Sequence, residues 1–370
     1  MNKLKTAIAH EWFVNYAGSE RVVESFTNIW PDADVFALVD FLNHEQRKII
    51  LKGKKAKTSF IQKLPFAKKR HRNYLPLFPK AIEKLDLSGY DVIVSSSHAV
   101  AKGFKKKDNQ LHITYCHSPM RYIWDQADQY LKGTKGLTAK LFMNYLRKWD
   151  LKSASNVDFF IANSHHIAEK IKRIYKREAE VIYPPVDTNK FEIGNKKEDY
   201  YLTASRMVPY KKLDLIVEAF NQMPDKKLVV VGSGPEKDNI KSAATPNVQI
   251  VGHQDRESLK SFMQKANAFV FAAEEDFGII VVEAMACGTP VIAFNKGGVK
   301  ESVINGTTGI LFEEQSSESI KNAVMQFENR IDLFDMAAIR KHSEKFSRMI
   351  FEENISNFVN EKVQKYFPDK

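Results

Sequence analysis

The most informative stretch of the sequence carries two carboxylates eight positions apart, Glu275 and Glu283, on either side of a glycine turn. The apolar run after Gly278 is typical of a buried helix. The first amides of a helix have no partner within the helix, so those of Gly278, Ile279 and Ile280 are suited to bind a diphosphate. Glu283, just over one turn into this helix, is placed to bind ribose hydroxyls, as carboxylates do in other nucleotide sites.

After its second glutamate, this segment continues Ala-Met-Ala-Cys-Gly-Thr-Pro-Val-Ile. The pattern resembles that of the family 4 glycosyltransferases, retaining enzymes of the GT-B fold that include mannosyl- and glucosyltransferases of polysaccharide assembly. The resemblance implies that Glu275 contacts the sugar of a nucleotide-sugar donor and that Glu283 binds its ribose. Asp276 departs from the family, in which a small residue is common. With Glu274 it makes an acidic entrance, in which Glu274 could be mistaken for the functional residue.

A second match is a pair of cations five positions apart, Arg206 and Lys211, after a strand expected at 200–204. In the family, such an arginine and lysine hold the donor diphosphate. Two fixed cations stabilise the charge that develops on a diphosphate leaving group without a metal. Lys212 stands where the family usually has glycine, and the sequence leaves open whether Lys211 or Lys212 is the ligand.

A third match is His117, which follows a strand expected at 113–115. The family has a histidine at the end of an N-terminal-domain strand that approaches the donor sugar, so the resemblance implies this role for His117. The run after it, with Met-Arg-Tyr-x-Trp-Asp, looks like a mannosyltransferase-type branch that acts on O-antigen and exopolysaccharide. His10-Glu11-Trp12 and the segment 95–103 share this likeness, and we expect them to line the acceptor side.

Smaller matches complete the predicted nucleotide site. Gly232 and His253 each follow a strand pattern at the place where the family holds the nucleotide base. Gly18 lies in a small-residue turn between the first strand and the first helix, where a phosphate or sugar could approach the helix N-terminus. Phe277, in the turn before Gly278, is assigned to the same site. We expect no metal and no cofactor besides the donor substrate.

Strand and helix patterns alternate along the chain, as in parallel sheets covered by helices. A first series of strands ends at Pro184-Pro185, and a second begins near residue 200. We predict an α/β protein of the GT-B type, with two Rossmann-like doubly wound domains facing across a cleft. The N-terminal, acceptor-side domain is expected at 1–190 and the nucleotide-sugar donor domain at 191–348. A final helix within 349–370 is expected to pack back on the N-terminal domain.

Length and charge agree with this division. A chain of 370 residues favours two domains of roughly 150–200 residues each. The formal net charge is +11, yet residues 46–107 alone hold 17 Lys and Arg and three acids, with aromatic residues and prolines between them. Such a basic region can bind nucleic acid, anionic lipid or a phosphorylated substrate, or can simply be a solvated face.

Targeting features and cysteines add two expectations. The N-terminus lacks the pattern of a signal peptide, and no apolar stretch reaches the roughly 18 residues of a membrane span. We therefore expect a cytoplasmic protein, peripheral on the inner face of the cell membrane. The two cysteines, Cys116 and Cys287, are too few for a cysteine zinc site and are expected to be buried free thiols.

These observations predict a retaining hexosyltransferase of surface polysaccharide synthesis. GDP-mannose is the favoured donor, with UDP- and dTDP-sugars behind it. The acceptor is expected to be a saccharide on a polyprenyl diphosphate at an anionic membrane, and no nucleic acid is expected. Two alternatives stay open: a nucleotide-sugar epimerase of the same fold, which needs no acceptor, and a non-catalytic basic scaffold protein.

Overall fold

The chain divides into two compact units. The computed structural model describes residues 4–125 and 137–368. Unit 1 comprises residues 1–185 and 351–370, and unit 2 comprises residues 186–350. The boundaries predicted from the sequence lie after residues 190 and 348.

Unit 1 is built on a parallel sheet with the strand order β3-β2-β1-β4-β5-β6-β7. Every residue of β4 and β5 is buried, as expected for a parallel sheet that is covered on both faces. The strands are β1 (Thr6–Phe13), β2 (Asp34–Asp40), β3 (Lys57–Thr58), β4 (Val92–Ser97), β5 (Leu111–Cys116), β6 (Phe159–Ala162) and β7 (Ala179–Val181).

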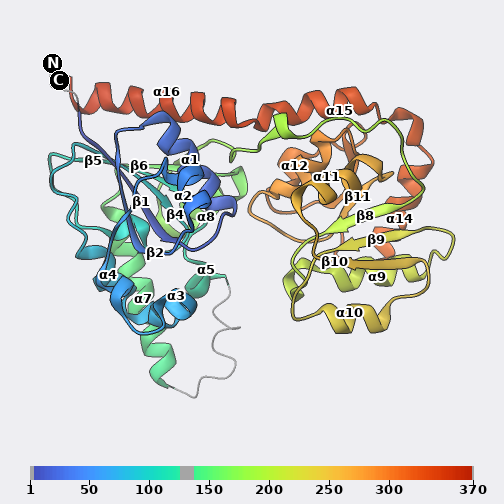
Figure 1. Cartoon of the computed structure of the whole chain (residues 1–370), viewed down its shortest axis with the longest axis horizontal. Coiled ribbons are helices and arrows are strands. Elements are labelled where there is room, and N and C mark those ends of the chain that lie inside the picture. Colours follow the sequence, from blue (N-terminus) through green and yellow to red (C-terminus); the bar gives the residue numbers. More distant parts are fainter. Residues whose placement is uncertain (1–3, 126–136, 369–370) are drawn as a thin grey trace. The chain divides into compact units, whose positions relative to one another are not determined.

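Helices cover both faces of this sheet (Figure 1). One apolar cluster joins the sheet to α4 and α7, and a second joins it to α1, α2 and α16. The α-helices are α1 (Gly18–Ile29), α2 (His44–Leu51), α3 (Ala67–Arg70), α4 (Phe78–Glu83), α5 (Arg121–Trp124), α7 (Leu137–Ser155), α8 (His165–Tyr175) and α16 (Arg348–Tyr366). Short 3-10 helices are η1 (Phe60–Lys63), η2 (His71–Leu77) and η3 (Ala101–Gly103).

The C-terminal helix α16 belongs to the core of unit 1 along most of its length. Phe351, Ile355 and Val359 are buried in the same apolar cluster as Phe26 of α1. The ring of Phe351 stacks on that of Phe26 at 6.2 Å and meets the ring of Tyr115 edge-on at 5.5 Å. The last segment of the sequence thus completes the fold of the first unit.

Unit 2 repeats the architecture with a parallel sheet of order β10-β9-β8-β11-β12-β13. Figure 1 shows α9 and α10 on one side of this sheet and α11 and α12 on the other. The strands are β8 (Tyr201–Ala204), β9 (Leu228–Val231), β10 (Val248–Gly252), β11 (Phe269–Phe271), β12 (Val291–Phe294) and β13 (Gly309–Phe312).

The α-helices of unit 2 alternate with its strands, as the sequence pattern predicts. They are α9 (Leu213–Asn221), α10 (Lys237–Ala243), α11 (Arg256–Lys265), α12 (Ile279–Ala286), α13 (Val299–Ser302), α14 (Ser317–Glu328) and α15 (Met336–Ser343). Short 3-10 helices are η4 (Thr188–Lys190), η5 (Pro209–Lys211), η6 (Ile331–Leu333) and η7 (Glu344–Phe346). Gly288, two residues after α12, has φ +71°, the left-handed conformation in which glycine commonly ends a helix.

Both cysteines are free and buried, as expected. Burial raises the pKa of each thiol to about 12, so both are protonated at neutral pH. None of the helices that the structure describes is both long and apolar enough to cross a membrane.

Candidate functional site

The loops after β8, β9 and β11 carry most of the residues that the sequence singled out in unit 2. These three strands are neighbours in the sheet, and all of them are parallel. Their carboxyl ends therefore lie at one edge, where open parallel sheets bind ligands. Arg206 and Lys211 follow β8, Gly232 follows β9, and the turn from Glu275 to Gly278 follows β11.

The side chains of Lys211 and Glu275 form an ion pair across this edge. The residues lie 64 positions apart in the sequence, and the pair is only partly screened, since the lysine is 15% exposed and the glutamate 25%. The Lys211 ammonium group also lies 5.8 Å from the ring centre of Phe271. A cation and a carboxylate are thus presented side by side, suited to contact a phosphate and a sugar hydroxyl respectively.

The neighbouring Lys212 has a different part in the structure. Its backbone is left-handed, with φ +56°, between η5 and α9. This conformation favours glycine, because it brings the Cβ atom of other residues close to the backbone. The glycine usual at this position in the resembling family has a conformational explanation, and Lys211 is the lysine that reaches Glu275.

Two glycines fix the backbone at Glu275. The amide of Gly298 donates to the carbonyl of Glu275 at 2.7 Å. Gly297 has φ +70°, and a methyl group there would lie 2.3 Å from the same carbonyl oxygen. The chain after β12 can approach this closely only without a side chain, so Gly297 determines where the Glu275 carboxylate stands. Glu274, by contrast, is exposed.

Helix α12 begins as the sequence predicts. Gly278 is its N-cap with φ +86°, and Ile279 and Ile280 in its first turn are half-buried. The helix has eight residues. Its first amides are free of partners within the helix and lie at its N-terminal end, next to the turn that carries Glu275. Phe277 is 3% exposed and packs on the ring of Phe346 at 5.5 Å, so its side chain belongs to the core of unit 2.

Glu283 lies in the buried part of α12, near a cation for which no role was predicted. Its carboxylate is 3.9 Å from the guanidinium of Arg256, on α11. Arg256 in turn contacts Asp187 at 3.3 Å. The carboxylate of Asp187 also forms ion pairs with Arg348 at 2.7 Å and with Lys190 at 3.2 Å. Burial alone would raise the pKa of Asp187, but Arg348 and Lys190 outweigh it and hold that pKa well below its usual range.

The glycine-rich turn after β9 supports the loop that carries Arg206. A methyl group at Gly232 would lie 1.9 Å from the carbonyl oxygen of Ser205, and the amide of Met207 donates to the carbonyl of Ser233 at 2.8 Å. Arg206 is exposed, as is His253 beyond the end of β10. Close backbone packing therefore explains why position 232 is glycine.

Two of the predicted site residues, Gly18 and His117, lie in unit 1. Gly18 is the first residue of α1. His117 follows β5, and its Nε2 is hydrogen-bonded to the hydroxyl of Ser96 at 2.8 Å. Burial, with the nearby histidines His98 and His10, lowers the pKa of His117 to about 3. Its imidazole is therefore neutral at physiological pH and offers a hydrogen bond without charge.

The strand β1 continues past His10 and Glu11 to Phe13. Its polar residues His10 and Glu11 are completely buried beside His98 and His117. For this group, only the family resemblance pointed to a role, and no role was predicted for Asp187, Arg256 or Gly297. The sequence has no local signal that Asp187 and Arg256 are partners, because they lie 69 positions apart, whereas Gly297-Gly298 could have been noticed as a glycine pair after a strand.

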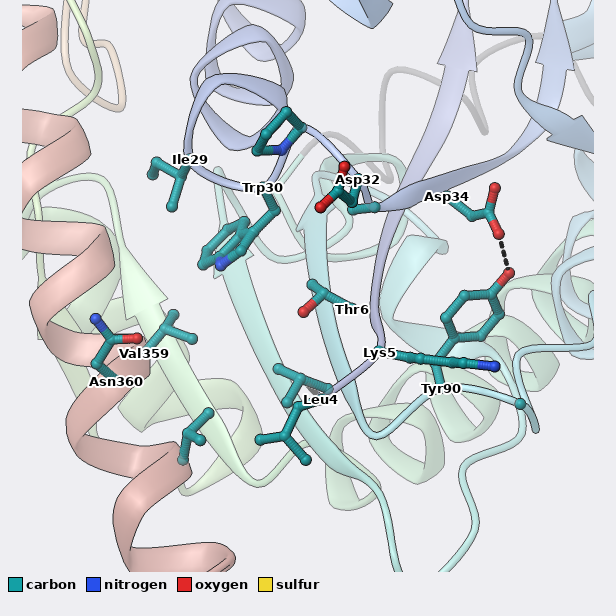
Figure 2. A pocket seen from close by; sticks show the side chains of 15 residues that line it. Leu4, Lys5, Thr6, Ile29, Trp30, Asp32, Asp34, Tyr90, Val359 and Asn360 are labelled. Carbon is teal, nitrogen blue, oxygen red and sulfur yellow. Dashed lines mark hydrogen bonds between the residues drawn. The ribbon is translucent and has the colours of Figure 1, made fainter. Parts of the chain in front are cut away.

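A pocket of unit 1 lies at the opposite, amino edge of its sheet. It has a volume of about 740 Å³ and is lined by the starts of β1, β2 and β4 and by α16. Figure 2 shows Leu4, Trp30 and Val359 on its wall. The carboxyl edge of the sheet, where the polar residues gather, is elsewhere, so we assign no substrate to this pocket.

The sequence contains one Asp-x-Asp triplet, Asp32-Ala33-Asp34, of the kind that binds metal in other transferases, and it borders this pocket. Asp34 accepts a hydrogen bond from Tyr90 at 2.5 Å (Figure 2) and pairs with Lys57 at 3.0 Å. Within residues 4–125 and 137–368, no group of three His, Cys, Asp or Glu side chains could hold a metal ion. Metal-independent chemistry stays a prediction.

Comparison with known proteins connects this geometry to a family. The family model described as Glycosyltransferase Family 4 matches residues 17–190, and that described as Glycosyl transferases group 1 matches residues 186–340. An uncharacterized glycosyltransferase of Methanocaldococcus jannaschii is 30% identical over 188 residues, which cover 49% of this chain and 52% of the relative. A GDP-mannose-dependent phosphatidylinositol monomannoside mannosyltransferase of Corynebacterium glutamicum is 31% identical over 173 residues, 42% of this chain and 45% of the relative.

These matches span about half the length of the curated relatives or less. Among solved structures, sucrose-phosphate synthase from Thermosynechococcus elongatus has a TM-score of 0.73 at 18% identity, with 97% of this chain and 99% of that chain covered. Anabaena HepE in complex with UDP has a TM-score of 0.71 at 17% identity, with 97% and 100% covered. The fold is that of the GT-B glycosyltransferases.

The packing of Gly297 against Glu275 gives a testable prediction for the stability of unit 2. Replacing Gly297 by alanine should destabilise the protein through a left-handed backbone and through a clash with a backbone oxygen 2.3 Å away. The matched control is Gly306→Ala, because Gly306 has φ +79° and no atom within 4 Å of an added methyl group. The control should cost about 1 kcal/mol, and Gly297→Ala about 1–3 kcal/mol more.

Thermal and urea unfolding of the two variants and the wild type measure this difference. Equal losses in the two variants would mean that the approach of residue 297 to Glu275 is not a constraint.

Proposed function

The chain belongs to the family 4 glycosyltransferases, and we propose that it is an enzyme that transfers a hexose from a nucleoside diphosphate sugar to a saccharide acceptor with retention of configuration. The observation that carries this proposal is the ion pair of Lys211 with Glu275 at the carboxyl edge of the unit 2 sheet. It presents a phosphate-binding cation next to a sugar-binding carboxylate, and the turn to α12 follows Glu275 directly.

The proposed donor site uses four groups of unit 2. Arg206, Lys211 and the first amides of α12 bind the diphosphate, because each offers a donor to an anionic oxygen. Glu275 accepts hydrogen bonds from the hydroxyls of the transferred sugar. Glu283 binds the ribose, and the guanidinium of Arg256 lies 3.9 Å from its carboxylate.

In the proposed reaction, an acceptor hydroxyl attacks the anomeric carbon on the face from which the diphosphate leaves. The bond from the acceptor oxygen to this carbon forms as the bond to the diphosphate oxygen breaks, and the hydroxyl proton passes to the departing phosphate. Negative charge grows on the leaving group, so Arg206, Lys211 and the helix amides stabilise the transition state more than the ground state. Removing one such group typically costs roughly 10²–10³ in rate.

GDP-mannose is the donor that we favour. The Corynebacterium relative is described as GDP-mannose-dependent, and the segment that begins at His117 resembles the mannosyltransferase-type branch. The solved structures of HepE contain UDP or UDP-glucose, so a uridine nucleotide is the principal competitor. The base would lie near Gly232 and His253, at the ends of β9 and β10.

We place the acceptor, a saccharide on a polyprenyl diphosphate, at the cytoplasmic face of an anionic membrane. Part of the basic region at 46–107 is neutralised within unit 1, because Lys57, Lys102 and Lys106 pair with aspartates outside that region. Several of the remaining exposed cations lie on the stretch from η1 to α4. They include Lys63, Lys68, Lys69, Arg70, Arg72 and Lys80.

Large apolar side chains project among these cations. Phe66 is 77% exposed, and Phe60 and Leu77 are also exposed. Phe66 has a left-handed backbone with φ +56° at the start of α3. Figure 1 shows α3, α4 and α7 at the same end of unit 1, and α7 adds exposed Leu141 and Tyr145. Exposed apolar residues surrounded by Lys and Arg suit the interface of an anionic bilayer.

The donor site predicts a nucleotide-specific stabilisation. GDP, UDP, dTDP and ADP are each added to the wild type, Glu283→Ala and the control Glu318→Ala, which changes an exposed glutamate on α14, and thermal unfolding is followed. A nucleotide at ~100 times its dissociation constant adds about 2.7 kcal/mol. We expect GDP to stabilise the wild type and Glu318→Ala most, and to lose most of this effect in Glu283→Ala.

If another nucleotide stabilises the wild type most, and this effect also requires Glu283, the donor site is supported and the donor carries that other base. If none of the four nucleotides stabilises the wild type, the site has been assigned wrongly and a non-catalytic role is favoured.

The membrane surface predicts salt-sensitive binding to anionic vesicles. The protein should bind vesicles of phosphatidylcholine with phosphatidylglycerol, and binding should fall sharply with added salt, because each Lys or Arg near such a surface contributes about 1 kcal/mol. Phe66→Ser should weaken vesicle binding roughly tenfold or more, since burial of a phenylalanine contributes about 1.5–3 kcal/mol.

Leu333→Ser is the matched control, because Leu333 is 67% exposed on η6 of unit 2. Salt-insensitive binding, or equal losses in the two variants, would argue against this membrane surface. Co-sedimentation with vesicles at several salt concentrations measures both.

A further inference from the structure

Glu283 lies at one end of a cluster of charged side chains in unit 2. The cluster holds two carboxylates, Asp187 and Glu283, and three cations, Lys190, Arg256 and Arg348. The side chain of Asp187 is 3% exposed and that of Glu283 is 10% exposed. Burying a charged side chain is costly unless it is paired and hydrogen-bonded. The contacts within the cluster show how this cost is offset and which cation is left able to meet a ligand.

Asp187 is the fixed centre of the cluster, because both of its carboxylate oxygens are engaged. Oδ1 accepts a hydrogen bond from Nε of Arg348 at 2.7 Å. Oδ2 accepts hydrogen bonds from Nζ of Lys190 at 3.2 Å and from Nη2 of Arg256 at 3.3 Å. Hydrogen bonds between ionised partners are the strong ones in proteins. Asp187 therefore gives Arg256, which comes from α11, a fixed acceptor.

The guanidinium of Arg256 is held in place and yet stays accessible. Its central carbon lies 5.7 Å from the ring centre of Phe191, within the range of a cation–π contact. Phe191 is buried, so this contact and the hydrogen bond to Asp187 fix the guanidinium from two directions. The side chain of Arg256 is nevertheless 37% exposed. The hydrogen bond to Asp187 uses one of the five N–H donors of a guanidinium.

Arg256 and Glu283 face each other at a distance that fits one atom between them. Nη2 of Arg256 lies 3.9 Å from Oε1 of Glu283, which is too long for a direct hydrogen bond. Hydrogen bonds to an oxygen span about 2.7–3.0 Å, so a single oxygen beside the pair can lie within reach of both atoms. Nη2 has a second hydrogen to donate, and Oε1 is an acceptor. A donor and an acceptor thus converge on one point.

A hydroxyl is the ligand group that meets both atoms at once. Its single oxygen accepts a hydrogen bond from the guanidinium and donates one to the carboxylate. A nucleobase, in contrast, presents its donors and acceptors on separate atoms. A phosphate oxygen would be repelled by the carboxylates of Asp187 and Glu283, which lie on two sides of the guanidinium. The chemistry of the pair therefore selects a neutral hydroxyl.

We propose that Arg256 and Glu283 together bind one ribose hydroxyl of the donor nucleotide, so that Arg256 determines the preference of the protein for ribonucleosides over deoxyribonucleosides. This inference rests on the proposed function for the assignment of Glu283 to the ribose, and Arg256 adds the donor to the hydroxyl oxygen. A site built to hydrogen-bond a hydroxyl rejects the analogue that lacks it, because its polar groups are then left unpaired.

Calorimetric titration of the full chain with ribo- and deoxyribonucleotides tests the role of Arg256. The probes are GDP, 2′-deoxy-GDP and 3′-deoxy-GDP, and the same three forms of UDP. We expect at least one deoxynucleotide to bind the wild type roughly tenfold or more weakly than its parent, since hydrogen bonds to two charged groups are lost. Arg256→Met removes the donors and should bind that deoxynucleotide and its parent with nearly equal affinity.

Lys260→Met is the matched control. Lys260 is a cation of the same helix, four positions further along α11, and pairs with Glu257 at 2.7 Å. This variant should keep the ribose preference of the wild type. If Arg256→Met does not fold, Arg256→Gln takes its place, because the shorter neutral side chain also removes the guanidinium. A loss confined to the 2′-deoxy nucleotides would support the proposal and also exclude dTDP-sugars, which lack that hydroxyl.

The role of Arg256 is overturned if the wild type binds the parent and both deoxynucleotides equally. It is also overturned if the preference survives without the guanidinium, or if Lys260→Met loses it to the same extent. Failure of the proposed function gives a different result. In that case neither GDP nor UDP binds, or their binding does not depend on Glu283, whereas nucleotide binding that requires Glu283 but shows no ribose preference refutes the role of Arg256 alone.

Discussion

The ion pair between Lys211 and Glu275 is the interaction on which the proposed donor site depends. It joins a loop after β8 to a turn after β11, two neighbouring strands of one sheet. The pair is held from both sides by backbone geometry. Lys212 has a left-handed backbone conformation and leads into α9. Gly297 and Gly298 pack closely against the backbone at Glu275. A diphosphate that binds this lysine therefore places its sugar beside a carboxylate whose position is fixed.

Much of unit 2 could be predicted from local sequence, because the proposed ligand-binding residues lie in the same short segments as the glycines that set the backbone conformation. Gly278 and Gly288 mark the beginning and end of α12, and the glutamates stand at fixed distances from them. The choice between Lys211 and Lys212 required the structure, because adjacent lysines carry the same charge and differ only in backbone conformation and in the direction of the side chain. The support of Glu283 by Arg256, and of Arg256 by Asp187, was also invisible, since these residues are 27 and 69 positions apart.

Unit 1 shows where local reasoning fails. Glu11 is a charged residue, yet the structure buries it within β1 by surrounding it with backbone amides from the loop after β4. The net charge of residues 46–107 was likewise a poor measure of the charge that this region exposes. Lys102, for instance, is 2% exposed and pairs with Asp150, 48 positions away. In both cases the partner that offsets the cost of burial comes from a distant part of the chain.

The measurement that tests the account most directly is the preference of the protein for a nucleoside diphosphate over the corresponding monophosphate, compared in the wild type, Lys211→Met and Lys212→Met by calorimetric titration. Hydrogen bonds to charged groups contribute about 1.5–3 kcal/mol, so the wild type should prefer the diphosphate by roughly tenfold or more. Lys211→Met should lose most of this preference, and Lys212→Met should keep it. A wild type that does not distinguish the two nucleotides, or a preference that depends on Lys212 instead of Lys211, would contradict the proposed site.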